Sequence, residues 1–269
     1  GPYEWKRVLE RGKTTMNGPH QGGWIHTKYS EDWFIHFQDK GPYGRVCHLQ
    51  PVDWSSGWPV MGNAGEPYWK FRKPKSDSKT IVNPVETDEF DSSKLGMQWQ
   101  WQNDYKESYG QATSMGFFRL FTYALPELGD VSNLWYVPNM LLQKIPADEF
   151  TATTKLSFCS RNSDQYVGLV CMSAEYSSVG LQRTEDGYEL QIRHNPNAMR
   201  THLTDEVLTV DTLKPTQKGT PRKGRPAEMH IKDVYLRMSI KDSKVNYAYS
   251  IDGKKWKKAG GEYAMGKGR

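Results

Sequence analysis

Between Trp24 and Val60, turn residues divide the sequence into short extended runs rich in aromatic and β-branched side chains. Runs of this length and spacing predict consecutive antiparallel strands. A fourth short run around Trp58 completes a group that spans about forty residues, the size of one propeller blade. Because a single blade cannot bury both of its faces, this sheet must lie against neighbouring blades or against the rest of the chain. The predicted strands cover 23–27, 32–38, 45–52 and 57–62.

The remainder of the chain contains many more short alternating runs, with Gly-, Asn- and Asp-rich breaks between them and almost no helix signals. This pattern predicts a two-sheet antiparallel sandwich. Asp252-Gly253 predicts a hairpin turn between the run that ends at Ile251 and the one that begins at Lys254. We therefore expect an all-β chain with three parts: residues 1–64, part of a propeller; 65–87, a Pro-, Lys- and Ser-rich linker along a surface; and 88–269, the sandwich.

The composition supports this fold class and narrows the range of partners. Aromatic residues make up 13% of the sequence, which suits β-architecture with aromatic-lined clefts better than a helical bundle. The densest basic cluster, 214–225, contains prolines and glycines that predict a mobile loop, and no nucleic-acid-binding motif accompanies it, so we expect no nucleic-acid partner. No apolar run approaches the ~20 residues of a membrane span. The 3 cysteines are too widely spaced to indicate a disulfide framework.

The stretch Asn17-Gly18-Pro19-His20-Gln21-Gly22-Gly23-Trp24 is the most distinctive motif of the chain, and further motifs follow it. These lie at 33–40, 43–51, 57–60, 90–101, 141–144, 167–170 and 249–256. In order and spacing, these motifs resemble those in the C-terminal part of glycoside hydrolase family 43 enzymes. That family comprises β-xylosidases and α-L-arabinofuranosidases built as a five-bladed propeller followed by a concanavalin A-like sandwich. The resemblance covers nearly the whole chain. It implies that the chain consists of the last blade of such a propeller and the sandwich that follows it.

The resemblance also implies an activity. Family members are inverting enzymes that release terminal α-L-arabinofuranosyl or β-D-xylosyl units from plant cell-wall polysaccharide or oligosaccharide. Their three propeller carboxylates would all lie upstream of Gly1, on N-terminal blades that this chain lacks, so we expect the chain alone to be inactive. The resemblance further implies a bacterial protein that is secreted or periplasmic. Two alternatives stay open: a non-catalytic carbohydrate-binding sandwich, and an interaction module without a sugar function.

His20 is the candidate metal ligand. It begins the innermost strand of the blade, where propeller side chains converge on the axis. By resemblance it reaches a central cation, usually calcium, whose remaining ligands are waters. Calcium prefers an oxygen shell, so a lone imidazole makes a weak site that depends on the complete ring of blades. The alternative is a structural histidine bonded to a backbone carbonyl.

Arg45 is the first candidate for substrate binding. By resemblance it points into the sugar pocket, where a guanidinium can hydrogen-bond hydroxyls and lower the pKa of a neighbouring carboxylate. The alternative is a surface arginine on the edge of the blade. Gln21, His36 and Gln38 are polar groups near the same end of the blade, and we expect them to line the pocket, although each alone is also compatible with a structural role.

The sandwich contains one loop of interest, at 161–166. In related enzymes this loop closes the active site with an aromatic side chain, whereas here Asn162, Ser163 and Asp164 occupy that place. We therefore do not expect the same lid contact. Most tryptophans of the chain are expected to be core residues, because an indole on a strand buries a large area.

Overall fold

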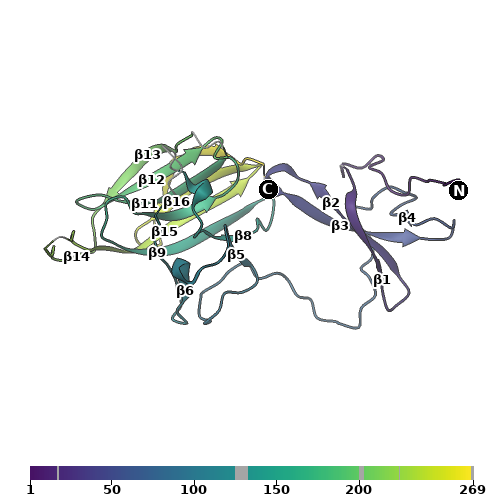
Figure 1. The fold of residues 1–269 in the computed structure, drawn as a ribbon, viewed down its shortest axis with the longest axis horizontal. Coiled ribbons are helices and arrows are strands. Elements are labelled where there is room, and N and C mark those ends of the chain that lie inside the picture. The colour runs from purple at the N-terminus through teal and green to yellow at the C-terminus, as the bar shows by residue number, and fades with distance from the viewer. Residues whose placement is uncertain (17, 125–132, 200–202, 224, 268–269) are drawn as a thin grey trace. The chain divides into compact units, whose positions relative to one another are not determined.

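The computed structural model of the chain describes residues 1–16, 18–124, 133–199, 203–223 and 225–267, with only the backbone given for His20. It divides into two compact units, Gly1–Asn83 and Pro84–Arg269, each with its own sheets and its own core. The described part consists of strands, loops and single-turn 3-10 helices (Figure 1). This confirms the predicted all-β class. Among these residues no helix is long and apolar enough to cross a membrane.

The first unit is a four-stranded antiparallel sheet with the strands in sequence order. A 3-10 turn at Gly41–Tyr43 joins the second and third strands, and Gly44, with φ of +77°, completes it by accepting from Lys40 N at 2.8 Å. Only glycine adopts such a φ without a steric penalty. The strands are β1 (His20–His26), β2 (Asp32–Asp39), β3 (Arg45–Asp53) and β4 (Val60–Met61).

The segment after β4 packs on this sheet. Arg72 lies over the buried Trp33 ring, 5.6 Å from its centre, and Phe71 meets the same ring edge-on at 5.9 Å. Most of the stretch that the sequence predicts to be a linker therefore belongs to the first unit, which ends at Asn83. Residues 76–83 are exposed.

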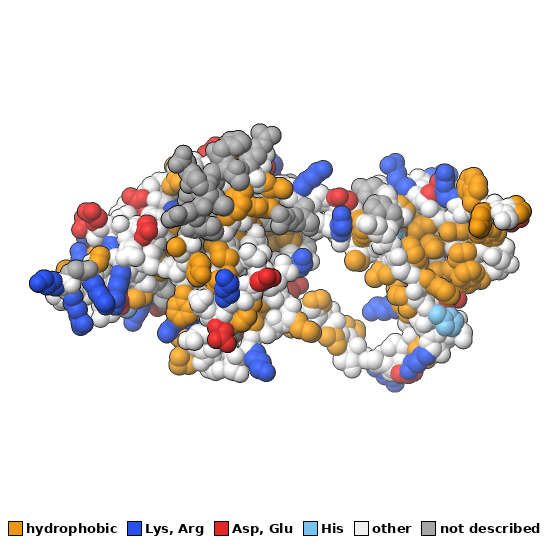
Figure 2. All heavy atoms as spheres, in the orientation of Figure 1, with side chains coloured by type: hydrophobic (Ala, Val, Ile, Leu, Met, Phe, Trp, Pro, Cys, Tyr) orange, Lys and Arg blue, Asp and Glu red, His pale blue; other side chains and the backbone are white. Residues whose placement is uncertain are grey.

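Several large apolar side chains of the first unit are exposed. In Figure 2, hydrophobic side chains gather over this unit. A four-stranded sheet with one short covering segment cannot bury both of its faces, which agrees with the blade-like character expected from the sequence. The exposed aromatic residues are Tyr3, Trp5, Trp24, Trp54, Trp69 and Phe71.

The second unit begins with an irregular region that carries two small two-stranded sheets. An aromatic cluster holds this region together: the Trp101 ring lies 5.7 Å from the Tyr109 ring and 6.1 Å from that of Phe118. Its elements are β5 (Trp99–Trp101), which pairs with β8 (Leu141–Gln143); β6 (Gly110–Ala112), which pairs with β7 (Phe118–Leu120); and the turns η2 (Glu107–Tyr109) and η3 (Leu134–Tyr136).

The rest of the second unit is the predicted antiparallel sandwich. One sheet has four strands in the order β10-β11-β12-β13, and the other has β15 at its centre, with β9 on one side and β14 and β16 on the other. The strands are β9 (Phe150–Ser160), β10 (Tyr166–Cys171), β11 (Tyr176–Arg183), β12 (Tyr188–Asn195), β13 (Glu206–Leu213), β14 (Gln217–Lys218), β15 (Met229–Lys241), β16 (Lys244–Ser250) and β17 (Lys257–Ala264).

Buried and more exposed residues alternate along β9 and β15, so their sheet turns one face to the core and the other to solvent. In β9, Phe158 and Ser160 are buried while Cys159 between them is exposed. The Tyr188 hydroxyl crosses the core, donates to the Met229 carbonyl at 2.7 Å and lies 3.0 Å from the Ser160 hydroxyl. A buried tyrosine needs such partners for its polar tip.

Two expectations about loops have different outcomes. The hairpin at Asp252-Gly253 is confirmed, because β16 before it and β17 after it pair with each other. Within the turn, Asp252 Oδ1 accepts from Lys254 N and Lys255 N at 2.8 Å each. The second strand starts at Lys257 and not at Lys254. The basic stretch 214–225 is not wholly a loop, because β14 within it pairs with the start of β15. All 3 cysteines are free.

Candidate functional site

Four polar side chains lie on one face of the first unit's sheet, two from β2 and two from β3. The register pairs His36 with His48, and alternation brings Gln38 and Gln50 to the same face. Gln38 is buried, its Nε2 donates to the Thr15 carbonyl at 2.9 Å, and its Oε1 lies 3.1 Å from His48 Nε2. His36 is buried as well. The structure thus unites two of the predicted site residues in a hydrogen-bonded interior.

Gln50 extends this network to the segment that follows β4. Its Oε1 accepts from Tyr68 N at 2.7 Å, and its Nε2 lies 3.4 Å from both Tyr68 O and His36 Nε2. Burial lowers the pKa of the His36 imidazole. Burial lowers the pKa of His48 too, helped by the charges of His36 and Lys40. Both histidines are therefore neutral at pH 7. Gln50, which the sequence did not single out, links His36 to Tyr68.

Arg45 lies on the opposite face of the same sheet. It begins β3 as the partner of Asp39, and its guanidinium carbon lies 4.8 Å from the centre of the Phe37 ring. The side chain is exposed. Within this unit, therefore, Arg45 does not share a surface with His36 and Gln38.

Gln21 and His20 lie where β1 is irregular. The register of β1 shifts between His20 and Gly23, and Gln21 within this bulge has φ of +52° and an exposed side chain. The backbone of His20 pairs with Phe37, whereas its side chain lies outside the described part of the structure. Calcium takes several oxygen ligands. Among the described residues of the first unit, no three His, Cys, Asp or Glu side chains converge on one point, so these residues alone do not form such a site.

Two carboxylates of the first unit are held in contacts that favour the ionised form. Glu31 accepts from Lys75 N at 2.8 Å and from Arg72 at 2.5 Å, and these contacts, the Lys75 amide foremost, lower its pKa. Asp32 accepts from His26 at 2.8 Å, which lowers the pKa of that carboxyl. The general acid of a glycosidase needs a raised pKa. Neither carboxylate is suited to that role.

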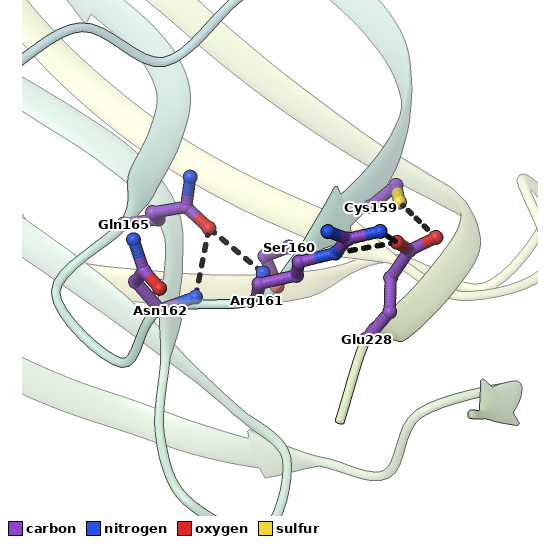
Figure 3. A pocket seen from close by; sticks show the side chains of 6 residues that line it. All are labelled: Cys159, Ser160, Arg161, Asn162, Gln165 and Glu228. Atoms are coloured by element: carbon purple, nitrogen blue, oxygen red, sulfur yellow. Dashed lines mark hydrogen bonds and ion pairs between the residues drawn. The ribbon is translucent and has the colours of Figure 1, made fainter. Parts of the chain in front are cut away.

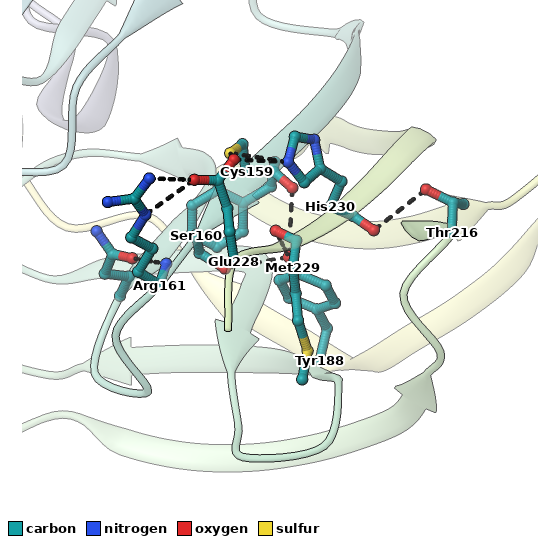
Figure 4. A network of polar contacts seen from close by, with 10 residues as sticks. Cys159, Ser160, Arg161, Tyr188, Thr216, Glu228, Met229 and His230 are labelled. Atoms are coloured by element: carbon teal, nitrogen blue, oxygen red, sulfur yellow. Dashed lines mark hydrogen bonds and ion pairs between the residues drawn. The ribbon is translucent and has the colours of Figure 1, made fainter. Parts of the chain in front are cut away.

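In the sandwich, three side chains of different chemistry meet on the outer face of the sheet that contains β9 and β15 (Figure 4). They are Cys159 from β9, His230 from β15, and Glu228 just before β15. Among the described residues this is the one group of three His, Cys, Asp or Glu side chains compact enough to hold a metal ion. The sequence reasoning missed it, because it depends on the pairing of two strands far apart in the chain.

A shallow pocket lies beside this group, and the loop 161–166 forms part of its wall (Figure 3). Gln165 Oε1 accepts from Arg161 N at 2.9 Å and from Asn162 N at 3.2 Å, so the loop closes on itself. The place at which related enzymes carry an aromatic is thus part of a compact polar turn. The pocket is lined by Cys159, Ser160, Arg161, Asn162, Gln165 and Glu228.

Comparison with known families accounts for most of the second unit. Residues 87–267 match the family model described as the β-xylosidase C-terminal concanavalin A-like domain. The chain belongs to this family. The resemblance to glycoside hydrolase family 43 and the predicted concanavalin A-like sandwich are thereby confirmed.

Alignments with curated relatives also cover the first unit. A putative β-xylosidase from Xylanibacter ruminicola is 31% identical over 275 residues, an alignment that takes in 100% of this chain and 46% of that protein. A non-reducing end α-L-arabinofuranosidase from Bacteroides ovatus is 26% identical over 210 residues, covering 77% of this chain and 35% of that protein. The chain thus spans less than half the length of these relatives.

Solved structures show the same fold. A family 43 protein from Bacillus licheniformis superposes with a TM-score of 0.73 at 21% identity, covering 98% of this chain and 49% of that one. A bifunctional protein from Bacteroides eggerthii, whose name includes family 43, gives a TM-score of 0.72 at 24% identity and covers 99% of this chain and 31% of that one. At these identities the likeness concerns the fold alone.

Proposed function

We propose that this chain is the C-terminal part of an inverting glycoside hydrolase that releases terminal β-D-xylosyl or α-L-arabinofuranosyl units from plant polysaccharide or oligosaccharide. The observation that carries the proposal is the family match over 87–267. A relative named as a putative β-xylosidase, aligned along the whole chain at 31% identity, supports it. In this proposal the four-stranded sheet of the first unit is one blade of a five-bladed propeller.

The catalytic carboxylates are proposed to lie outside these 269 residues. Inverting hydrolysis needs a carboxylic acid to protonate the leaving oxygen and a carboxylate to activate water, about 6.5–9.5 Å apart. Contacts with Lys75 and His26 keep Glu31 and Asp32 ionised, which removes both as proton donors. Because the chain spans 46% of its β-xylosidase relative, the rest of such an enzyme has ample length to supply both groups.

The first unit is proposed to contribute Arg45 and Gln21 to the sugar pocket. Both side chains are exposed. A guanidinium that lies over a ring, as that of Arg45 does over Phe37, keeps its N–H donors in its own plane, where sugar hydroxyls can accept from them. His36 and Gln38 are buried, and for them we propose a supporting role, in which they fix the strand that carries Phe37.

His20 is proposed to face the propeller axis and to add one ligand to a calcium ion there. Its backbone position at the start of β1 supports this. Because calcium prefers oxygen ligands, the other ligands must be waters or oxygen groups from other blades.

Activity measurements test the proposal directly. A longer protein that contains this chain should hydrolyse an aryl β-D-xyloside or an aryl α-L-arabinofuranoside, and the 269-residue chain alone should hydrolyse neither. In the longer protein, Arg45→Met should lower kcat/KM by at least about 10-fold, as expected when a charge-assisted hydrogen bond to the substrate is lost. Turnover by the isolated chain would overturn the location of the carboxylates, and a longer protein inactive on both substrates would overturn the activity.

The two large sheets of the sandwich give no support to the alternative of a non-catalytic carbohydrate-binding protein. Such proteins stack sugars on exposed aromatic side chains. Among the described residues from 150 to 267 no Phe, Tyr or Trp side chain is exposed, and Tyr176, Tyr188 and Tyr247 are buried in the core. The exposed aromatic residues of the second unit, Tyr105, Phe117, Phe121 and Tyr123, lie in the irregular region before the sandwich and not on either large sheet.

A further inference from the structure

A thiol, an imidazole and a carboxylate lie close together on the outer face of the sheet that contains β9 and β15. Cys159 and His230 are direct partners in the pairing of β9 with β15. Glu228 lies two residues before His230, so its side chain projects from the same face, while Met229 and Ile231 point into the core. Antiparallel pairing and strand alternation therefore bring the three groups together.

The three potential ligand atoms form a closed triangle. Cys159 Sγ lies 3.1 Å from Glu228 Oε1 and 3.3 Å from His230 Nε2, and the last two atoms are 2.8 Å apart (Figure 4). In tetrahedral zinc sites, with bonds of about 2.0–2.3 Å, neighbouring ligand atoms are separated by about 3.3–3.6 Å. Shifts of a few tenths of an ångström, within reach of side-chain rotation, would open the triangle to that size.

We propose that Cys159, Glu228 and His230 bind a zinc-like divalent transition-metal ion, with the fourth position open to water. Thiolate and imidazole ligands favour zinc over calcium or magnesium, which prefer oxygen. The site faces solvent: Cys159 is exposed, and the side chains of Glu228 and His230 are each 33% exposed. Two of the three ligands, Cys159 and Glu228, also line the adjoining pocket of Figure 3.

Arg161 holds the Glu228 carboxylate in place. Arg161 binds the other oxygen of Glu228, with Nε at 2.8 Å and Nη2 at 2.7 Å, so Oε1 stays directed at Cys159 and His230. Outer contacts of this kind orient metal ligands in proteins. In the metal-free chain the Cys159 thiol donates to Glu228 Oε1, and binding of a metal ion would displace this proton.

The backbone that carries Glu228 and His230 is fixed on two sides. Thr216 N donates to the His230 carbonyl at 2.8 Å, and its hydroxyl donates to the same oxygen at 3.1 Å. From the core side, the Tyr188 hydroxyl donates to the Met229 carbonyl at 2.7 Å (Figure 4). Gly219 N donates to the Glu228 carbonyl at 2.8 Å, so Glu228, at the edge of β15, and His230, within it, are both held by backbone hydrogen bonds. The proposal is independent of the sugar-cleaving activity, since it concerns the sandwich surface only.

Metal titration of the reduced 269-residue chain tests this inference. After removal of metal with a chelator, Co²⁺ should bind at one equivalent and produce the thiolate-to-cobalt charge-transfer band of a site with one cysteine, and Zn²⁺ should displace it. Cys159→Ser should abolish the band, and both Cys159→Ser and His230→Gln should weaken Zn²⁺ binding by about 10-fold or more. Far-ultraviolet circular dichroism should show that each variant is folded.

Cys47→Ser is the matched control, because Cys47 is also an exposed free cysteine but lies in the first unit. This variant should keep the band and the affinity of the original chain. Absence of a cobalt band in the original chain, its persistence in folded Cys159→Ser, or its loss in Cys47→Ser would each overturn the assignment.

Discussion

His36 and His48 are cross-strand partners whose rings stack with centroids 5.4 Å apart inside the first unit. Burial lowers the pKa of both, so the folded unit accommodates the two rings as neutral groups. Two imidazolium rings in contact would repel each other and would lose part of their hydration. The stability of this unit is therefore linked to pH.

We expect the first unit to lose stability as the pH falls below about 6.5, the pKa of an unperturbed histidine. Below that value the unfolded chain binds protons that the folded unit resists, because the folded pKa values are depressed; above it the contribution is fully present. Hydrogen exchange of β2 and β3, followed by mass spectrometry, should show protection falling between pH 6.5 and 5. His48→Gln should flatten this dependence, and His194→Gln in the second unit should not. Equal pH dependence in both variants would contradict the explanation.

We expect Glu31 to hold the segment after β4 against the sheet of the first unit. Its carboxylate accepts from Lys75 N and Arg72, and Glu31→Gln weakens both contacts because an amide carries no charge. Trypsin should then cleave after Arg72 and Lys75 several times faster than in the original chain. Glu10→Gln, which alters an exposed ion pair with Arg7, is the control, and an equal rate in both variants would show that Glu31 does not hold the segment.

Tyr188→Phe should destabilise the sandwich by about 1–3 kcal/mol, because the buried Met229 carbonyl and Ser160 hydroxyl each lose the tyrosine hydroxyl as a partner. Urea unfolding followed by circular dichroism measures the effect. Tyr105→Phe removes a hydroxyl from a side chain that is 57% exposed and should leave the unfolding midpoint unchanged. If the two variants unfold at the same urea concentration, the Tyr188 hydroxyl contributes nothing to the core.

Gly180→Ala should also destabilise the sandwich, by about 1–3 kcal/mol. A Cβ at Gly180 would collide with the Val167 carbonyl and with the Tyr166 ring. The thermal midpoint should fall, whereas Gly261→Ala, where nothing lies within 4 Å of the new atom, should be near neutral. A normal midpoint for Gly180→Ala would mean that Tyr166 moves aside without cost.

The sequence predicted the strands better than the surroundings of their side chains. Alternation in β2 indicates that His36 and Gln38 share a face, but not whether that face meets a sugar or the segment that contains Tyr68. The separation of Arg45 from these two residues depends on the register, in which Arg45 pairs with Asp39 after a tight turn. In a hairpin the turn type and the loop length fix this register.

The group at Cys159 was beyond sequence reasoning for a different reason. Cys159 and His230 are 71 positions apart, and neither lies in a metal-binding motif with short spacing. Alternation alone would have placed each on an outer face, yet only the pairing of β9 with β15 makes them neighbours. Local pattern therefore fixes the side on which a residue lies and leaves its partner open.

The pairing of β9 with β15 also has a consequence for synthesis on the ribosome. Phe150 pairs with Ile240, so β9 has no strand to pair with until β15 has been synthesised. Contacts between residues so distant in sequence form slowly, since a large loop must close first. During that interval the apolar side of β9 is uncovered, and a nascent chain in this state is a natural client for chaperones.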